Sequence, residues 1–581
     1  MEKGSASPRD LGHLFSKTAV NRKPSAIKQY YKFFAIPGVG NLAGGLPNSR
    51  FFPFETLEAQ SAKPERWTPT PNYPDGEDDH LDATGNGSQP KAATHLTVPM
   101  ASGEKDPVKK IDLETALQYG TGEGYPPLLS FVRQFSQRVL HPNVPHSAGV
   151  DVVMTCGSTD GFSKTLELFN NPWSEGDPIS RKQGLLCEIF MYSNVLSQSQ
   201  PRGMNIVPVE MDADGMLAHG TGGLEDVLEN WDSSKGQRPH MLYTNGPQPN
   251  GRGAPVRRRK ELYAICQKYD VIIVEDDPYW YLQYPSADRA EARSRQKPEP
   301  TTQVPPAPAK SSGYEFIDSL VPSFLSIDVD GRVVRLDTFS KTVAPGCRLG
   351  WITAQPAFIE RYVRITETST QQPSGFVQSM IAQLLLGHQT ETVARFLSLG
   401  SKERQTFAGW STDGWVRWLA GLRGSYERRM NRMCAIIDEY SYEPRVASKR
   451  PGLDSDWAYV RLHRHRCFGQ QGKSRTIDGP LISAALMIYL THAPYKVLVA
   501  PGSMFAANDD IRQTLAWSWF RICFAAEAEE KIDDCAHRFG TGVREFFKIK
   551  NPEDIEELYE EFEPRMLESP DAADAFSGLG C

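Results

Sequence analysis

Short apolar runs alternate with amphipathic segments through the middle of the chain. The apolar runs are rich in β-branched residues and end in glycine, acidic or hydroxyl-bearing turns, as buried strands do. They span 150–155, 184–188, 205–210, 241–244, 271–276 and 333–336. The run 271–274 is continuously apolar and is followed by acids, which is typical of a central parallel strand. The alternation predicts an α/β fold in which a mostly parallel central sheet lies between helices.

Changes of composition divide the chain of 581 residues further, and this length exceeds the usual size of one hydrophobic core. Two segments rich in proline and charged residues, 61–110 and 284–313, are expected to be a flexible insertion and a low-complexity surface insertion. The other expected segments are an N-terminal arm with part of a small domain (1–60), a large domain (111–390), a smaller C-terminal α+β domain (391–548) and a loosely attached acidic tail (549–581).

A lysine follows one of the predicted strands, at a position where a charge is costly to bury. The strand 333–336 leads to Thr338, Ser340 and Lys341, and Arg348 follows seven residues later. Desolvation lowers the pKa of a lysine, and such a lysine can condense with an aldehyde. The two hydroxyls and the guanidinium suit a phosphate. An aldehyde and a phosphate on one molecule indicate pyridoxal 5′-phosphate (PLP), and a Ser-Lys pair on a surface turn is the alternative.

Two other strands end in residues that suit the same ligand. The strand 150–155 breaks into a glycine turn that carries Ser158 and Thr159 and leads into a helix. This arrangement places a phosphate at a helix N-terminus. The strand 271–276 ends in Asp276 and Asp277. Because ligands of open α/β sheets bind at the carboxyl ends of the strands, we expect these groups and Lys341 to meet there.

Three further residues leave a structural and a ligand-binding interpretation open. Arg521 stands inside an apolar strand, where its charge needs an anionic partner, either a structural carboxylate or a substrate carboxylate. Tyr119 lies at the start of a glycine-rich loop and is either a core residue or a ligand contact. Gly45, in a Gly-Gly loop, is part of a plain turn or a point where the backbone approaches a ligand.

The composition excludes several other classes of protein. A net charge of −7 and a pI near 6.0 argue against a broad nucleic-acid-binding surface. The nine cysteines include no Cys-x-x-Cys pair, so neither a zinc ribbon nor a disulfide framework is indicated, and no metal is expected. Residues 1–21 lack the apolar core of a secretory signal, and the apolar run 481–490 is too short to cross a bilayer. We therefore expect a cytoplasmic protein.

Several motifs occur along the chain in one order: LAGGLPN at 42–48, LQYG at 117–120, Gly-Ser at 157–158, VEDDPY at 274–279, SIDVDG at 326–331, the stretch 337–350, and Arg521. In this order they resemble the fold-type I PLP-dependent aminotransferases. The resemblance is strongest to the fungal aromatic amino acid aminotransferases and their relatives acting on kynurenine and 2-aminoadipate. It implies that 111–390 is the large PLP-binding domain.

The resemblance implies roles around the cofactor. Lys341 would hold PLP covalently and then move a proton between the substrate Cα and C4′ of the cofactor. Asp276, rather than Asp277, would pair with the pyridine nitrogen, because the family places a tyrosine three residues after this acid and Tyr279 stands there. Tyr279 would hydrogen-bond the ring hydroxyl oxygen, and Tyr192 would stack on the ring. The phosphate would be held by Ser158, Thr159, Thr338, Ser340 and Arg348.

The resemblance also implies substrate contacts and an assembly. Arg521 would clamp the substrate α-carboxylate in a bidentate manner, with Gly45 and Tyr192 as further substrate contacts. Tyr119 would reach the phosphate in the neighbouring subunit, which implies a homodimer with shared active sites. The implied partners are amino acid and 2-oxo acid substrates, with neither nucleic acid nor membrane.

One position departs from the family pattern. The family's loop usually reads Asn-Pro-Thr-Gly, and its asparagine donates a hydrogen bond to the ring oxygen. This chain has Gln248 at the matching position, followed by Pro-Asn-Gly. Glutamine can also donate through its amide, but it is one methylene longer, so a shifted ring is expected if Gln248 binds the cofactor.

The leading hypothesis is reversible ping-pong transfer of an amino group from an aromatic or related large L-amino acid to 2-oxoglutarate. The Gln248 loop motivates two alternatives: a PLP-dependent lyase that catalyses β-elimination or C–S cleavage, and a homologue of low activity. A PLP-binding transcriptional regulator is disfavoured, because the segment before Gly44 is too short for a winged-helix DNA reader.

Overall fold

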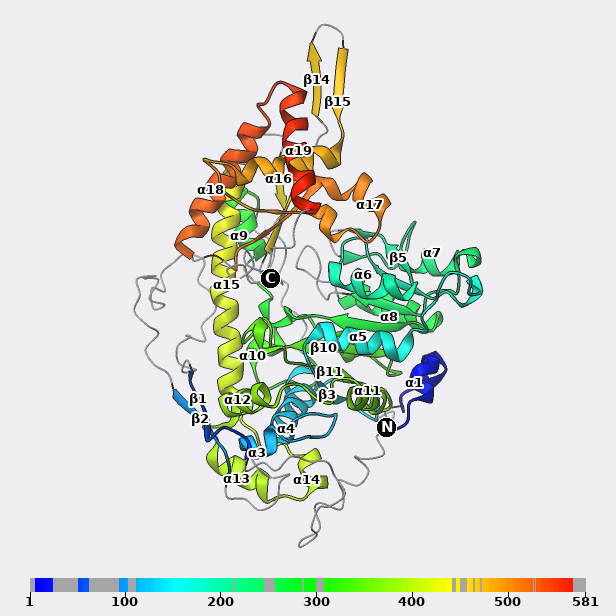
Figure 1. Ribbon diagram of the computed structural model, residues 1–581, viewed down its shortest axis with the longest axis vertical. Helices are drawn as coiled ribbons and strands as arrows, with labels where there is room; N and C mark the ends of the chain where they lie inside the picture. Colours follow the sequence, from blue (N-terminus) through cyan, green and yellow to red (C-terminus); the bar gives the residue numbers. More distant parts are fainter. Residues whose placement is uncertain are drawn as a thin grey trace.

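The computed structural model describes most of the chain (Figure 1). The described residues are 6–24, 51–61, 94–102, 111–212, 215–244, 256–284, 287–298, 308–440, 446–449, 457–462, 466–470, 473–525, 527 and 529–567. Gly45 and Gln248 therefore lie outside the described residues, as does most of the segment 61–110.

A seven-stranded sheet forms the centre of the large domain. Its strand order is β3 (Asp151–Thr155), β11 (Gly350–Ala354), β10 (Val333–Thr338), β9 (Ile272–Asp276), β8 (Met241–Thr244), β4 (Gly184–Glu188) and β5 (Asn205–Val209). The pairs from β10 to β5 are parallel, and only β11 runs antiparallel to its two neighbours. The predicted mostly parallel sheet is confirmed, and β10 continues two residues beyond its predicted end.

Helices cover both faces of this sheet (Figure 1). On β10, Val334 and Leu336 pack into one apolar cluster, whereas the preceding residue, Val333, packs into another cluster on the opposite face. This alternation is expected when successive side chains of a strand point to opposite faces. The helices of the first cluster are α5 (Ser158–Phe169) and α11 (Pro356–Thr368). Those of the other clusters include α4 (Pro126–Gln134), α7 (Leu224–Glu229), α8 (Val256–Lys268) and α12 (Gly375–Leu386).

A second, smaller domain follows a 28-residue helix, α15 (Asp413–Tyr440), which runs from the large domain into it (Figure 1). Its antiparallel sheet has the order β12 (Val446–Lys449), β13 (Trp457–Leu462), β17 (Trp519–Cys523) and β16 (Ala500–Pro501). The helices α16 (Gly479–Thr491) and α18 (Glu529–Phe546) share an apolar cluster with these strands. The fold class is therefore the predicted one, a large α/β domain with a smaller α+β domain.

Two segments are more ordered than expected. Within 284–313, helix α9 (Ala287–Ser294) packs against α15, and Arg295 forms a 3.0 Å ion pair with the buried Asp438. Within 549–581, helix α19 (Pro552–Leu567) packs against α16 and buries Ile555 completely. The expectation of a loosely attached tail is wrong for this helix, because acidic residues on its outer face hid the apolar residues of its inner face.

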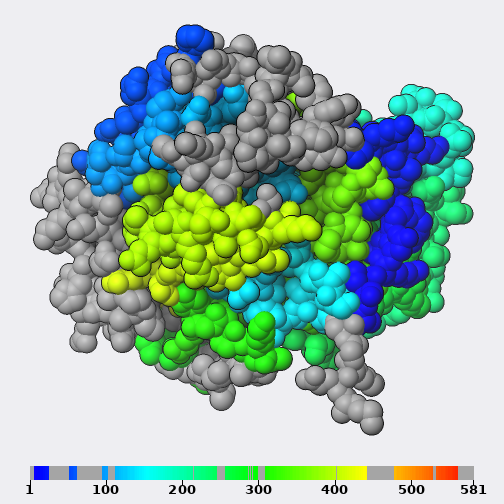
Figure 2. Space-filling model, turned by 90° about the horizontal axis from the view of Figure 1, so that it is seen from below, coloured from blue at the N-terminus to red at the C-terminus, as the bar shows by residue number. Residues whose placement is uncertain are grey.

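The N-terminal segment lies on the large domain, beside α11 (Figure 2). Phe15 packs against Phe169 and Phe358, with ring centroids 5.8 Å apart in both pairs. The strand β1 (Thr56–Ser61) pairs antiparallel with β2 (Thr94–Pro99), which lies within the segment 61–110. The remaining elements are α1 (Lys17–Asn21), α3 (Leu113–Ala116), α6 (Ser193–Ser199), α10 (Glu315–Asp318), α13 (Thr390–Ser398), α14 (Ser401–Gln405), α17 (Asp509–Thr514) and the hairpin β14 (Arg466–Gln470)–β15 (Lys473–Ile477). None of the described helices is long and apolar enough to cross a membrane.

Candidate active site

A candidate anion site lies where the turn after β3 meets the loop after β10. Gly157 has a φ of +97°, and a Cβ at this position would lie 2.7 Å from Nη2 of Arg348. The Arg348 guanidinium therefore lies directly over a glycine that has no room for a side chain. Arg348 itself has a φ of 46°, and its Nη1 donates to the Pro345 carbonyl at 2.7 Å. The arginine is thus fixed by its own turn, with its outer side exposed.

Hydroxyls and a helix N-terminus complete this anion site. Arg348 Nη1 donates to Ser340 Oγ at 3.3 Å, and Ser340 Oγ lies 2.8 Å from Thr338 Oγ1. Ser158 is the first residue of the 12-residue helix α5, and Thr159 is the second. Free backbone N–H groups and the helix dipole favour an anion at such a terminus. Arg348, Ser340 and Thr338 are therefore joined by hydrogen bonds, and Arg348 lies against Gly157, which directly precedes Ser158 and Thr159.

Asp276 lies at the carboxyl end of β9, opposite Leu336 of β10, with 7% of its surface exposed. Its Oδ2 accepts a 2.8 Å hydrogen bond from the hydroxyl of Tyr243. Its Oδ1 is buried and has no hydrogen-bond partner of normal length among the described residues. Burial raises the pKa of Asp276 to about 6, while Tyr243 and the nearby Ser158 hydroxyl oppose this rise. One carboxylate oxygen is therefore left for a ligand.

Asp277 faces the other side of the sheet, into a buried ionic cluster. Arg335 forms ion pairs with Glu275 and Asp337, each at 3.1 Å, and Arg259 pairs with Glu275 at 3.1 Å. Burial alone would raise the pKa of Glu275, but Arg335 and Arg259 hold it below its usual value. Burial raises the pKa of Asp277 to about 8. This placement supports the choice of Asp276 over Asp277 as the ligand group.

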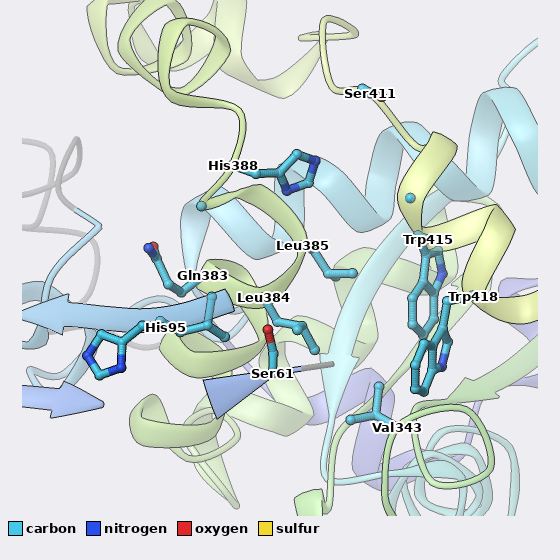
Figure 3. Close-up of a pocket in the computed structure, with 13 residues that line it drawn as sticks. Ser61, His95, Val343, Gln383, Leu384, Leu385, His388, Ser411, Trp415 and Trp418 are labelled. Carbon is cyan, nitrogen blue, oxygen red and sulfur yellow. The ribbon is translucent and has the colours of Figure 1, made fainter. Parts of the chain in front are cut away.

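Lys341 is half-buried, with its Nζ 5.2 Å from the ring centroid of Tyr279. This distance is within the range of a cation–π contact. The loop that carries Lys341 is held from behind, because Trp418 Nε1 donates to the Thr342 carbonyl at 2.8 Å. Trp418 and Trp415 also line a cavity of about 350 Å³ between α12, α15 and the β1–β2 hairpin (Figure 3). The lysine loop therefore separates this cavity from the anion site.

Arg521 reaches the site from the small domain. It stands at the middle of β17, paired with Tyr459 of β13 and Ala500 of β16. Its guanidinium lies 4.5 Å from the centroid of Phe505, a contact that orients the planar group. The backbone of Phe505 accepts a hydrogen bond from Met191 N at 2.8 Å. The next residue, Tyr192, is 46% exposed and begins helix α6. This contact brings the loop of Tyr192 to the segment that supports Arg521.

Some predicted site residues are not brought together here. Tyr119 is 56% exposed, and its described contacts are with Gln118 rather than with another predicted site residue. Gly120 next to it approaches Gln372, so this loop packs against the connection between α11 and α12. The positions of Gly45 and Gln248 in the site stay predictions, because both lie outside the described residues.

Three groups of site residues were missed by the sequence analysis. Tyr243 is the third residue of the buried strand β8 and lies opposite Val274, two residues before Asp276, so the parallel register of β8 with β9 is the signal that places them together. Phe505 follows a short strand predicted at 497–502 and gave no chemical signal. The Arg335 cluster was hidden because a charge inside an apolar strand reveals its partners only through strand pairing.

These groups fit PLP. The cofactor's phosphate suits the cup in which Arg348 covers Gly157. Its pyridine nitrogen needs a buried carboxylate, and Asp276 Oδ1 is buried and unpaired among the described residues. PLP also needs a primary amine. Lys341 provides one: it follows strand β10, and its Nζ lies beside the Tyr279 ring.

Comparisons with known proteins agree with this fit. The family described as aminotransferase class I and II matches residues 88–408. An aromatic amino acid aminotransferase of Schizosaccharomyces pombe is 31% identical over 549 residues, covering 94% of this chain and 99% of that protein. An L-tyrosine:2-oxoglutarate aminotransferase of Tapinella panuoides is 32% identical over 582 residues, covering 93% and 97%.

Among solved structures, aminotransferase Aro8 from Candida albicans superimposes with a TM-score of 0.70 at 29% identity, covering 94% of this chain and all of that one (100%). These matches favour transamination over the lyase reaction. The chain therefore belongs to the aminotransferase class I and II family and is a PLP-dependent aminotransferase.

Proposed function

We propose that this protein transfers the amino group of an aromatic or similarly large L-amino acid to 2-oxoglutarate. The names of its relatives support this choice: the fission-yeast relative is called an aromatic amino acid aminotransferase and the Tapinella relative an L-tyrosine:2-oxoglutarate aminotransferase. The single observation that carries the proposal is that the buried Asp276 lies opposite Leu336, on the strand that leads to Lys341 and Arg348.

A phosphate-binding set, one acid and one tyrosine would hold the cofactor. Arg348, Ser340 and the N-terminus of α5 would bind its phosphate through charge-assisted hydrogen bonds. Asp276 Oδ1 would accept a hydrogen bond from the protonated pyridine nitrogen, and Tyr279 would donate to the ring hydroxyl oxygen. When bound, PLP supplies a carbonyl that condenses with amines and a ring that accepts electrons from the substrate Cα.

Substrate orientation and proton movement would fall to two residues. Arg521 would bind the α-carboxylate with both guanidinium nitrogens, because its plane is already fixed against Phe505. Once the substrate amine has replaced its own, Lys341 would take the proton from the substrate Cα and deliver it to C4′ of the cofactor. The Tyr279 ring, 5.2 Å from Nζ, would keep the lysine near that position.

Assembly and location are part of the proposal. The 56% exposure of Tyr119 supports its contact with the phosphate of a neighbouring subunit, in a homodimer with shared sites. We place the protein in the cytoplasm, because the cysteines of the described residues form no disulfide. Gly45 would line the substrate site, and Gln248 would replace the family's asparagine near the ring oxygen.

A substrate panel tests the proposal. Purified enzyme with PLP would be given phenylalanine, tyrosine, tryptophan, kynurenine or 2-aminoadipate together with 2-oxoglutarate, and glutamate formation would be measured. We expect the highest kcat/KM with an aromatic amino acid. A preference for 2-aminoadipate alone would overturn the aromatic assignment.

Two controls separate the reaction classes. Lys341→Ala should abolish turnover and the absorbance of the lysine-bound cofactor, and turnover by this variant would contradict the assignment of Lys341. Incubation with amino acid but without any 2-oxo acid should release neither pyruvate nor ammonia beyond the background, since a lyase needs no acceptor.

A further inference from the structure

A buried tyrosine supports the acid that faces the cofactor nitrogen. Tyr243 is the third residue of β8 and is completely buried. Its hydroxyl donates to Asp276 Oδ2 at 2.8 Å, and this is its only hydrogen bond among the described residues. The ring is fixed by an edge contact with Phe162 of α5, with centroids 5.1 Å apart. Ring and hydroxyl are thus held in one direction, toward Asp276.

This hydroxyl can act only as a donor. Burial raises the pKa of Tyr243 far above its usual value, and the neighbouring Asp276 raises it further. The phenol is therefore held in its protonated form, which donates to Asp276. A hydrogen bond to a buried carboxylate stabilises the ionised form and lowers its pKa. It also fixes the plane of the carboxyl group, since Oδ2 is occupied and Oδ1 is the oxygen left free.

We infer that Tyr243 is a positioning residue, which holds Asp276 ionised and turned so that Oδ1 faces the pyridine nitrogen of the cofactor. The inference deepens the proposed function and rests on it, because it assumes that Asp276 pairs with that nitrogen. The register of the sheet brings these two residues together: β8 and β9 are parallel neighbours, and Tyr243 lies opposite Val274, two residues before Asp276.

The other groups around Asp276 do not replace this hydrogen bond. Ser158 of α5 lies nearby and lowers the pKa of Asp276, but forms no hydrogen bond of normal length. From β10, Asp337 raises the pKa of Asp276 and Arg335 lowers it. Arg335 is already engaged by Glu275 and Asp337 on the opposite side of the sheet. Among the described residues, Tyr243 is thus the side-chain donor that lies within normal hydrogen-bond distance of the carboxylate.

Removing the hydroxyl should weaken cofactor binding in a pH-dependent way. In Tyr243→Phe, the pKa of Asp276 should rise above the value of about 6 that it has with the hydrogen bond. More Asp276 is then protonated near neutral pH and cannot pair with a protonated pyridine nitrogen. We expect the Kd for PLP to increase about tenfold near neutral pH, since hydrogen bonds to charged groups have this effect. The increase should shrink at alkaline pH, where Asp276 is ionised in both proteins.

The experiment measures the Kd of the apoenzyme for PLP between about pH 6 and about pH 9 by tryptophan fluorescence, before any substrate is added. Tyr362→Phe is the matched control. Tyr362 of helix α11 is an equally buried tyrosine, and its hydroxyl lies 2.9 Å from Thr165 Oγ1, within hydrogen-bond distance. Tyr362→Phe should lower the thermal midpoint like Tyr243→Phe but leave the Kd for PLP and its pH dependence unchanged. Asp276→Asn is the second control and should weaken PLP binding at every pH.

The outcomes separate the inference from the proposed function. A pH-dependent loss of PLP affinity in Tyr243→Phe, absent in Tyr362→Phe, supports the positioning role. Equal or absent effects in the two tyrosine variants, with weak PLP binding by Asp276→Asn, overturn the inference and leave the role of Asp276 intact. Normal PLP binding by Asp276→Asn overturns the inference together with the role of Asp276 in the proposed function.

Discussion

Replacing Gly157 by alanine should damage the phosphate site in a way that can be calculated from the structure. The φ of this residue is +97° with a ψ of 173°, a region that residues other than glycine rarely adopt. Forcing alanine into it costs about 1–3 kcal/mol. The new Cβ would also lie 2.7 Å from Nη2 of Arg348, closer than van der Waals contact allows.

The second effect is the one that bears on function. The contacted atom is the end of a flexible side chain, so the conflict is relieved by moving the Arg348 guanidinium out of the cup. A displaced arginine loses its charge-assisted contact with the phosphate, which is worth about 1.5–3 kcal/mol. The Kd for PLP should therefore increase about 10- to 100-fold.

Gly176→Ala is the matched control. Gly176 has nearly the same φ, +96°, and a Cβ there would meet nothing within 4 Å. Both variants should lose thermal stability, and only Gly157→Ala should bind PLP and inorganic phosphate more weakly. Titration of each apoenzyme with both ligands measures this. Equal PLP affinities in Gly157→Ala and Gly176→Ala would refute the reasoning, because the contact with Arg348 would then have no consequence.

Three further outcomes are expected. Arg335→Met should destabilise the fold by about 3–5 kcal/mol, because Glu275 and Asp337 each lose their ion pair with Arg335. Its thermal midpoint should fall far below that of the control Arg257→Met, whose arginine is exposed. Asp277→Asn should stabilise the protein more at about pH 8 than at about pH 5. Burial raises the pKa of Asp277 to about 8, so the folded state retains a proton that the unfolded chain releases, and the stability of the wild-type protein falls as the pH rises. Thermal midpoints of the two proteins that stay parallel across this pH range would contradict the prediction. Trp418→Phe should lower kcat because Thr342 beside Lys341 loses its 2.8 Å hydrogen bond, whereas Trp415→Phe, which lines the same cavity, should leave kcat nearly unchanged.

The sequence was informative at two positions where a residue's chemistry conflicts with its expected burial, although the same conflict at Arg335 was missed. Lys341 after a buried strand and Arg521 inside one are costly unless a ligand or partner compensates, so each pointed to a site before any coordinates were known. Asp276 was chosen over Asp277 from the resemblance, and the alternation of the strand explains why adjacent acids face different surroundings.

Residues whose chemistry matches their burial carried no such signal. Tyr243 and Phe505 are aromatic residues in a protein interior, and nothing in their own type or spacing marks them. Tyr243 is informative only through the register of β8 with β9, and Phe505 only through its contact with Arg521 across two elements. Helix α19 was missed for a related reason, since its many acids outweigh the few apolar residues that bury against α16.

Phe505 explains how two domains build one site. Its ring supports Arg521, which stands on the sheet of the small domain. Its own segment, however, packs in the same apolar cluster as Val274 and Leu336, which precede Asp276 and Thr338 on the large sheet. Backbone hydrogen bonds from Met191 to Phe505 and from Ala507 to Ile189, at 2.8 and 3.0 Å, join this segment to the loop of Tyr192. Under the proposed roles, the distance from Arg521 to Lys341 would therefore be set by packing on the large domain, and a substrate held by Arg521 would be placed relative to Lys341 by the core itself.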